Sequence, residues 1–281
     1  MPMEVSEVPL TFSCDENLLV GIVHMPEQCK RNGVVIVVGG PQYRVGSHRQ
    51  FLLLARFLAA NGIPVMRFDY RGMGDSSGDL CTFEHVNDDV TMAIDIFFEQ
   101  CPKLESVCVW GLCDAASAAL FYAHQDRRVS SLVLLNPWIR TDAGEAKAYL
   151  KHYYFSRLTS KDFWKKVFSG NFRATASLRS VSKLTKAARD VDGTSNALSL
   201  PEKMLFGLKQ FSGSVLIILS GKDLTASEFR DLISSNQDWE RVLKKKQVVI
   251  KELPEANHTF STAELRSDVE NITLNWLLKI K

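Results

Sequence analysis

Short, wholly apolar runs alternate with helical patterns along the first half of this chain, and this alternation restricts the possible folds more than any other feature. An apolar run of about four to eight residues between turn residues is typical of a strand buried on both faces of a parallel sheet. Such strands are expected at 33–40, 64–70, 106–111 and 129–135, with helices between them at 51–60, 83–100 and 115–124. Repeated β-α-β units predict an α/β fold, with a mostly parallel central sheet and helices on both of its faces.

The pattern of buried strands stops after residue 139 and resumes near residue 213. The stretch between is aromatic, basic and helix-prone. Two further strands are expected at 213–220 and 247–253, and a closing helix at 268–279. A helical insertion between two strands of one sheet predicts a cap over the carboxyl ends of the strands, where open α/β sheets place their ligand sites. The expected organisation is a core of residues 1–139 and 209–281 with a helical, basic cap at 140–208.

Composition excludes several classes of protein. The 281-residue chain is 46% hydrophobic and 23% charged, which is ordinary for a globular protein. Its apolar runs fall short of the roughly 20 residues that cross a bilayer, and the N-terminus lacks the basic and then apolar order of a secretory signal. We therefore expect a soluble, cytoplasmic protein without a transmembrane segment. Six cysteines form no CxxC pair, which argues against a disulfide framework and against a zinc site.

Positive charge is concentrated in one part of the chain. The formal net charge is +2, but residues 146–190 hold eleven Lys or Arg and two Asp, a net +9, so the remainder carries −7. One interpretation is that the aromatic residues of this stretch pack on the core while its charges are solvated. The functional alternatives are docking of an acidic acyl carrier protein or of coenzyme A phosphates, or attachment to an anionic membrane face. No nucleic-acid-binding module accompanies the charge, so nucleic acid is not an expected partner.

The most specific local motif is Gly111-x-Cys113-x-Ala115. An expected buried strand runs directly into it, and a helix of small residues follows, which is the strand-turn-helix setting of a nucleophile elbow. The position of the nucleophile holds Cys113. A thiol at a helix N-terminus and beside a histidine ionises near neutral pH, because the helix dipole and the imidazolium favour the thiolate. The alternative is that Cys113 is a core thiol after a strand.

Two later residues stand where an acid and a base would follow the nucleophile in chain order. Asp223 comes directly after the strand expected at 213–220, and His258 follows the last expected strand. Taken alone, Asp223 is equally suited to capping the next helix, and His258 to an ordinary loop. Together with Cys113 they predict a catalytic triad, in which Cys113 attacks an acyl carbonyl, His258 acts as the base and Asp223 orients the imidazole.

The remaining parts of the expected site lie beside the elbow and after the first buried strand. An oxyanion needs backbone N–H donors, and the residue after the nucleophile, Asp114, supplies one. Pro41 has no N–H, so Gln42 is the expected second donor. Tyr43, Arg44 and His48 are candidates for substrate binding, although His48 also suits the exposed start of a helix. No cofactor and no metal are expected, since the glycines at 72, 74 and 78 do not have dinucleotide-binding spacing.

Several of these segments together resemble one family. They are VGGPQYR at 38–44, SHRQ at 47–50, RFDYRGMGDS at 67–76, WGLCDAAS at 110–117, LLNPW at 134–138 and EANHTFS at 255–261. With them, the chain resembles the exosortase A system-associated hydrolases of type 1, which belong to the α/β-hydrolase superfamily and are encoded beside bacterial exopolysaccharide genes. The resemblance runs from about residue 5 to 275 and implies an α/β-hydrolase fold in which Cys113, Asp223 and His258 are nucleophile, acid and base.

The chain departs from the commonest superfamily pattern in two places. Gly39 and Gly40 replace the usual His-Gly, and Cys113 replaces serine. A thiolate attacks activated acyl groups readily, but the thioester that it forms is hydrolysed slowly by water. The predicted function is therefore hydrolysis of an ester or thioester through an acyl-cysteine intermediate. Acyl transfer to an alcohol or amine, or release of an acyl group from a carrier, would use the same triad. A non-catalytic scaffold with this fold is the further alternative.

Overall fold

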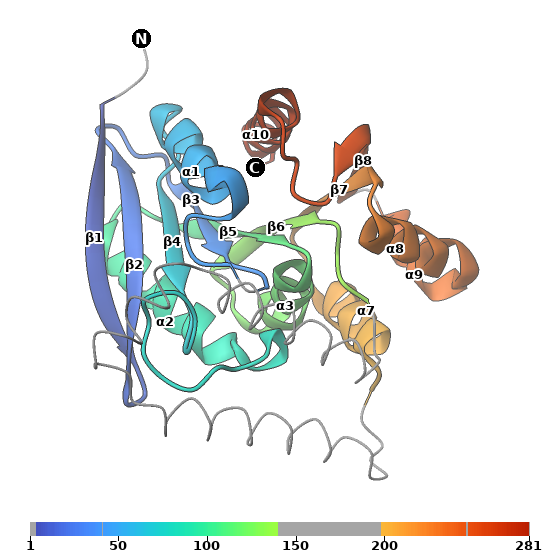
Figure 1. Ribbon diagram of the computed structural model, residues 1–281, viewed down its shortest axis with the longest axis horizontal. Helices are drawn as coiled ribbons and strands as arrows, with labels where there is room; N and C mark the ends of the chain where they lie inside the picture. The colour runs from blue at the N-terminus through green and yellow to red at the C-terminus, as the bar shows by residue number, and fades with distance from the viewer. Residues whose placement is uncertain (1–3, 41, 140–197, 246, 281) are drawn as a thin grey trace, which may run out of the picture. The chain divides into compact units, whose positions relative to one another are not determined.

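The computed structural model describes residues 4–40, 42–139, 198–245 and 247–280. Within these ranges the chain forms an eight-stranded sheet with the order β1-β2-β4-β3-β5-β6-β7-β8 (Figure 1). The strands are β1 Val5–Cys14, β2 Asn17–Pro26, β3 Asn32–Val37, β4 Val65–Asp69, β5 Ser106–Leu112, β6 Val129–Leu135, β7 Ser214–Lys222 and β8 Val248–Asn257. From β4 to β8 neighbouring strands are parallel, whereas β1 and β2 are antiparallel.

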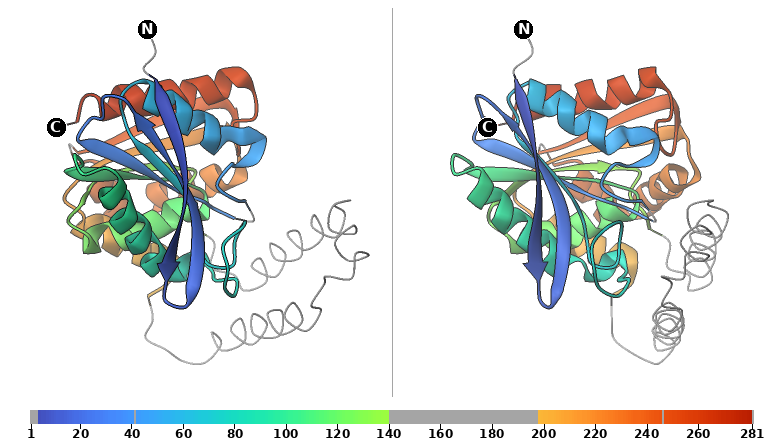
Figure 2. Two further views of the ribbon diagram at one scale, coloured as in Figure 1. Left: turned by 90° about the vertical axis from the view of Figure 1, so that its left-hand side faces the viewer. Right: turned by 60° about the vertical axis from the view of Figure 1, so that its left-hand side comes forward.

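Helices cover both faces of this sheet. They are α1 Gln50–Ala60, α2 Asn87–Gln100, α3 Asp114–Tyr122, α7 Leu200–Gln210, α8 Leu224–Ser235, α9 Gln237–Leu243 and α10 Ala263–Leu277. Helices α1 and α10 lie on one face, and α2 and α3 lie on the other (Figures 1 and 2). The main core cluster lies between the sheet and the first pair, where Phe51 and Leu58 of α1 and Leu274 of α10 are buried against β3 and β5. The predicted α/β fold with a mostly parallel sheet is confirmed.

The N-terminal hairpin of β1 and β2 was not among the predicted elements. Strand β1 is half-exposed and carries polar residues along most of its length, so it lacks the continuous apolar run that marked the inner strands. Its turn is made by Asp15, which has a positive φ of 51°. The hairpin adds an antiparallel edge to an otherwise parallel sheet, and it lies at the opposite edge from β7 and β8 (Figure 1).

The expected cap at 140–208 falls mainly outside the described residues. Residues 140–197 lie outside them, and these include the whole basic stretch at 146–190. The helical cap and the role of its positive charge therefore stay predictions. By their contacts the described residues before 140 and after 200 belong to one compact unit. In the described part of the chain, no helix combines the length and the apolar character that crossing a membrane requires.

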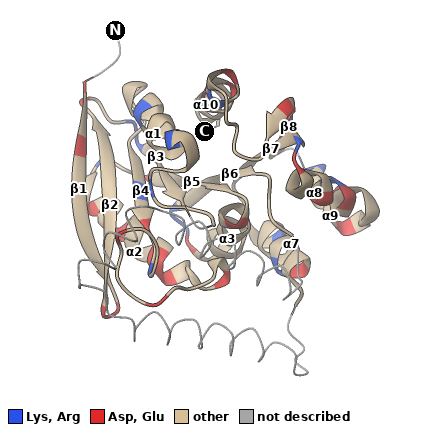
Figure 3. Cartoon of the chain, in the orientation of Figure 1, with Lys and Arg blue, Asp and Glu red and all other residues tan. Residues whose placement is uncertain are grey.

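Charges of both signs are interleaved on helices α7 and α9 (Figure 3). Lys209 of α7 binds Asp238 of α9 at 2.7 Å, and Arg241 lies 3.3 Å from the same carboxylate. Lys244 pairs with Glu240 one helical turn away, at 2.5 Å. Exposed pairs of this kind stabilise a fold only slightly. Their main effect here is to neutralise the surface of α7 and α9 locally.

A buried polar pair joins β2 to β4 inside the sheet. His24 is 0% exposed and Arg67 is 1% exposed, and the Arg67 Nε–H donates to His24 Nε2 at 2.9 Å. Burial, and then the positive charge of Arg67, lower the pKa of His24 to about 4. Because Nε2 accepts a hydrogen bond, His24 has to be neutral in the folded protein. Arg67 also donates to the carbonyl of Arg44, in the loop after β3.

The low pKa of His24 predicts a loss of stability in mild acid. The unfolded chain binds a proton at His24 below a pKa of about 6.5, whereas the folded chain binds it only below about 4. The free energy of unfolding should therefore fall by up to about 3 kcal/mol as the pH falls through this window. Urea denaturation at a series of pH values measures it. His24→Gln should flatten the curve of unfolding free energy against pH. His85→Gln, at an exposed histidine, is the control and should keep the wild-type curve. Equal curves for wild type and His24→Gln would contradict the prediction.

Candidate active site

Cys113 lies in a sharp turn between β5 and α3. Its backbone has φ 62° and ψ −123°, a conformation that residues with a side chain adopt only when their surroundings impose it. Here the Cys113 N–H donates to the Leu135 carbonyl of β6 at 2.8 Å, and the Cys113 carbonyl accepts from the Ala116 N–H at 3.0 Å. The half-buried thiol is thus held at the carboxyl end of a central strand and at the N-terminus of α3. This is the geometry of a nucleophile elbow.

The glycine two residues before Cys113 is required by close contact between the strand and the helix. A Cβ atom at Gly111 would lie 2.6 Å from the backbone carbon and oxygen of Ala115. Real Cβ atoms do not approach backbone so closely, so β5 and α3 can meet at this angle only over a glycine. The predicted spacing of small residues around Cys113 therefore has a direct steric cause.

This contact predicts that Gly111→Ala lowers the free energy of unfolding by about 2–3 kcal/mol, because neither backbone segment can yield without moving the elbow. Denaturant titration at neutral pH measures the change. Gly21→Ala is a matched control, since the nearest atom to its new Cβ is the flexible end of Met66 at 3.1 Å. If both variants were equally stable, close packing would not explain the glycine at 111.

Asp223 and His258 meet at the carboxyl ends of the last two strands. Asp223 follows β7 and His258 follows β8, and Asp223 Oδ2 lies 3.0 Å from His258 Nδ1. Asp223 Oδ2 also accepts the Ala226 N–H at 3.1 Å, so the same carboxylate caps α8. Because a carboxylate only accepts, Nδ1 carries the proton and Nε2 is left as the basic atom.

The environment of Asp223 keeps it ionised. Its side chain is 8% exposed, and burial by itself raises the pKa of the carboxyl. The hydrogen bond and charge of His258, with the N–H groups of Ala226 and Thr225, outweigh that effect, and the net pKa of Asp223 lies below its ordinary value. An ionised Asp223 is the form that accepts the hydrogen bond from His258 Nδ1.

All three members of the predicted triad lie at one edge of the sheet. Strands β5, β7 and β8 are parallel, so the turns that follow them gather at their common carboxyl edge. The structure brings Asp223 and His258 into hydrogen-bonding contact and gives Cys113 its strained turn. The reaction of Cys113 with His258 as its base stays a prediction.

The loop after β3 is tied to the elbow by the side chain of Asp114. This residue is 7% exposed; Oδ2 accepts the Gly40 N–H at 3.0 Å, and Oδ1 accepts the Ala115 N–H at 2.9 Å. A Cβ atom at Gly39 would lie 2.4 Å from Asp114 Oδ1 and 2.4 Å from the Leu112 carbonyl oxygen. Only the backbone N–H of Asp114 was predicted to take part in the site, because no local pattern indicates a side-chain partner so distant in the chain.

Gln42 has the features of an oxyanion donor. Its side-chain Oε1 accepts the Ser47 N–H at 2.8 Å, which fixes the turn that follows. The Gly40 N–H is engaged by Asp114, whereas the Gln42 N–H makes no hydrogen bond in the part of the chain that the structure describes. The Gln42 N–H is therefore available as a donor, and its role as the second oxyanion contact stays a prediction.

The three candidate substrate contacts differ in their surroundings. Tyr43 is 46% exposed. Arg44 pairs with the buried Asp69 and, at 2.8 Å, with Asp75, so its guanidinium joins the loop after β3 to the loop after β4. His48 lies in a short turn before α1 and has a positive φ of 51°. No described contact joins Tyr43, Arg44 or His48 to Cys113, and substrate binding by them stays a prediction.

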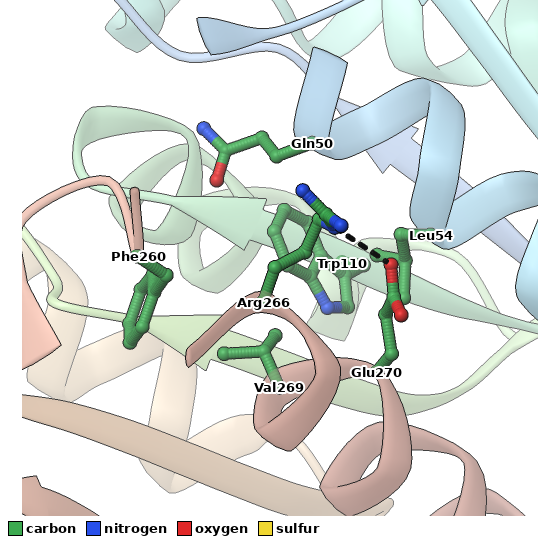
Figure 4. Close-up of a pocket in the computed structure, with 7 residues that line it drawn as sticks. All are labelled: Gln50, Leu54, Trp110, Phe260, Arg266, Val269 and Glu270. Carbon is green, nitrogen blue, oxygen red and sulfur yellow. Dashed lines mark ion pairs between the residues drawn. The ribbon is translucent and has the colours of Figure 1, made fainter. Parts of the chain in front are cut away.

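A small cavity is lined by residues of α1, β5 and α10 and by Phe260 (Figure 4). Its volume is about 10 Å³, and it is lined by Gln50, Leu54, Trp110, Phe260, Arg266, Val269 and Glu270. Burial raises the pKa of Glu270, which lies 3.6 Å from Arg266. A space of this size holds about one water molecule. None of the three predicted triad residues lines it, so it is not the substrate pocket.

Comparison with known proteins gives one family and many similar structures. The family model described as "Serine aminopeptidase, S33" matches residues 30–260. The esterase PF2001 of Pyrococcus furiosus is similar, with a TM-score of 0.68 and 17% identity over 99% of this chain and 92% of that chain. The α/β hydrolase GrgF from Penicillium sp. sh18 has a TM-score of 0.61 and 16% identity, over 97% of this chain and 96% of that chain.

An acylaminoacyl peptidase of Pyrococcus horikoshii has a TM-score of 0.63 and 16% identity, and the similarity covers 99% of this chain but only 42% of that one. No protein with a curated description matches the sequence. At these identities the structures establish the fold alone, and the predicted α/β-hydrolase fold is confirmed. The finer resemblance to the exosortase A system-associated hydrolases stays a prediction.

Proposed function

Because the chain belongs to the serine aminopeptidase family of α/β hydrolases, we propose that it hydrolyses an ester or thioester through an acyl-cysteine intermediate on Cys113. The observation that carries this proposal is the 3.0 Å contact between Asp223 and His258 at the sheet edge where Cys113 occupies a strained elbow. An oriented acid-base pair and an elbow at the same edge are what acyl transfer requires. A scaffold without turnover has no need of either.

The proposed reaction begins with the thiol of Cys113. His258 Nε2 takes the thiol proton, and the sulfur attacks the acyl carbon. The N–H groups of Asp114 and Gln42 bind the oxyanion that forms. When the tetrahedral intermediate collapses, the leaving alcohol or thiol takes its proton from His258, and a thioester remains on Cys113. A water molecule then gives a proton to His258 and attacks this thioester, releasing a carboxylic acid and the thiol.

Cysteine in place of serine favours activated acyl donors. The family takes its name from a serine enzyme, but in this chain the elbow holds a thiol at the N-terminus of α3, where the helix dipole stabilises the thiolate. A thiolate attacks thioesters, lactones and aryl esters readily. Its acyl-cysteine product is a thioester, on which an alcohol or amine competes with water. The presence of Cys113 therefore supports acyl transfer as the second candidate function.

The natural acyl donor can be inferred from the charge of the chain. The basic stretch at 146–190, with its net charge of +9, would suit an acidic acyl carrier protein or the phosphates of coenzyme A. The resemblance to exosortase A system-associated hydrolases adds a setting in bacterial exopolysaccharide metabolism. From this charge and this resemblance, we propose that the natural donor is an acyl group bound to a carrier protein or to coenzyme A.

Intact-mass spectrometry tests the proposal directly. The wild-type protein is incubated briefly with a panel of acyl thioesters and aryl esters, and peptide mapping locates any acyl group. We expect a mass increase equal to the acyl group, on Cys113 alone. Added alcohols or amines shorten the lifetime of the adduct if the enzyme is a transferase and leave it unchanged if water is the acceptor. Turnover of a donor with the acyl group on another residue, or no adduct and no product with the whole panel, would contradict the proposal.

A further inference from the structure

Asn136 occupies a central place between the elbow and the acid-base pair. It directly follows β6, which lies between β5 and β7 in the sheet (Figure 1). Its side chain is 0% exposed, and its backbone has a positive φ of 43°. Asparagine adopts this conformation more readily than most residues, but a fully buried amide in it has to be held by its partners.

The side-chain amide of Asn136 binds the ends of both strands that carry the acid and the base. Its Oδ1 accepts the Ser220 N–H at 2.9 Å, and its Nδ2 donates to Ser220 Oγ at 2.9 Å and to the His258 carbonyl at 3.3 Å. Ser220 Oγ in turn donates to the Asn257 carbonyl at 3.0 Å. The end of β7 and the turn that presents His258 are thus joined through one amide.

The backbone around Asn136 holds the elbow from the other side. Leu135 accepts the Cys113 N–H at 2.8 Å, and the Trp138 N–H donates to the Cys113 carbonyl at 3.2 Å. The hydroxyl of Ser117, in the first turns of α3, donates to the Trp138 carbonyl at 2.6 Å. The segment 135–138 is therefore bonded to the nucleophile turn by its backbone and to the base turn by the side chain of Asn136.

From these contacts we infer that Asn136 is a positioning residue that fixes the His258 turn relative to the Cys113 elbow. The inference rests on the proposed function and deepens it. Asn136 touches none of the reacting atoms and acts through the backbone of His258. This role requires one short side chain that accepts one hydrogen bond and donates two, on a backbone with a positive φ. Asparagine meets all of these requirements. Misplacing a reacting group by about 1 Å costs on the order of 100-fold in rate.

Two variants test the inference. Asn136→Gly accepts the positive φ but removes the amide. Asn136→Asp keeps the shape and the acceptor but loses both donations. The first readout is the rate of alkylation of Cys113 by iodoacetamide as a function of pH, followed by intact mass. The second is kcat and KM with whichever acyl donor labels the wild type. Asn61→Asp is the matched control, because its exposed amide donates only to the Phe57 carbonyl of its own helix.

For both Asn136 variants we expect kcat to fall about 10- to 100-fold with KM changed little, and alkylation of Cys113 to require a higher pH. A merely structural role would lower the melting temperature without moving that pH profile. A folded Asn136→Gly protein with the wild-type profile and kcat would overturn the inference.

If neither Asn136 variant folds, Ser220→Ala decides, because it breaks the same network at one hydroxyl: a shifted profile supports the inference and a wild-type profile overturns it. The alkylation readout needs no substrate. A wild-type protein that forms no acyl adduct would therefore contradict the proposed function, while the pH profiles still decide the role of Asn136.

Discussion

Replacing Cys113 with alanine should lower kcat/KM by at least about 10⁴-fold, the size of loss that follows removal of a catalytic nucleophile. Without the sulfur no acyl-enzyme forms, so the acyl adduct should disappear from the mass spectrum as well. The free energy of unfolding should change by less than about 1 kcal/mol, because only one half-buried atom is removed and the backbone bonds of the elbow remain.

The measurement compares wild type and Cys113→Ala for turnover, adduct mass and thermal unfolding. Cys29→Ala is the matched control, since Cys29 is also half-buried and lies just after β2, in sequence far from the elbow. A Cys113→Ala protein with full activity would remove Cys113 from the mechanism. Loss of activity together with loss of the fold would call for Cys113→Ser, which keeps the volume and tests the chemistry alone.

Replacing His258 with alanine should have the second-largest effect, a loss on the order of 10³- to 10⁴-fold in kcat/KM. It should also raise the pH at which Cys113 is alkylated. In the proposed pair the imidazolium of His258 would stabilise the thiolate, so its removal would raise the pKa of the Cys113 thiol and leave a smaller fraction ionised at neutral pH.

Alkylation rates from about pH 5 to pH 10 report this shift, in a range set by the ordinary pKa of cysteine. His85→Ala, at an exposed histidine that contacts Thr82, controls for a general change of charge. An unchanged alkylation profile in His258→Ala would count against the pairing of His258 with Cys113, whatever happened to turnover. A shifted profile would indicate that His258 acts on Cys113 as its base. An unchanged profile with slower turnover would indicate that His258 acts only in a later step.

The features that could be predicted from the sequence are those that depend on neighbouring residues. The inner strands were predictable because each is one continuous apolar run, and the elbow because small residues flank Cys113 at fixed spacing. Asp223 and His258 were predictable because each follows a strand directly. Asp223 caps α8 and also binds His258, so the capping role does not exclude the contact that a triad requires.

The features that escaped prediction depend on residues far apart in the chain. Gly40 and Asp114 are separated by 74 positions, and Asn136 and His258 by 122. A sequence read in order contains no signal for such pairs, since asparagine after a strand is also an ordinary turn residue. Strand β1 escaped for a different reason, because this half-exposed edge strand mixes polar and apolar residues.

The tie between Asp114 and the loop after β3 limits how this site can be redesigned. Position 39 has no room for a side chain, because the Asp114 carboxylate and the end of β5 occupy that space. An engineer who wished to install the His-Gly of other hydrolases would have to replace Asp114 and also move the end of β5. Positions 39, 40 and 114 therefore have to be varied together with the end of β5, because a side chain placed at 39 alone would collide with the Asp114 carboxylate and the Leu112 carbonyl.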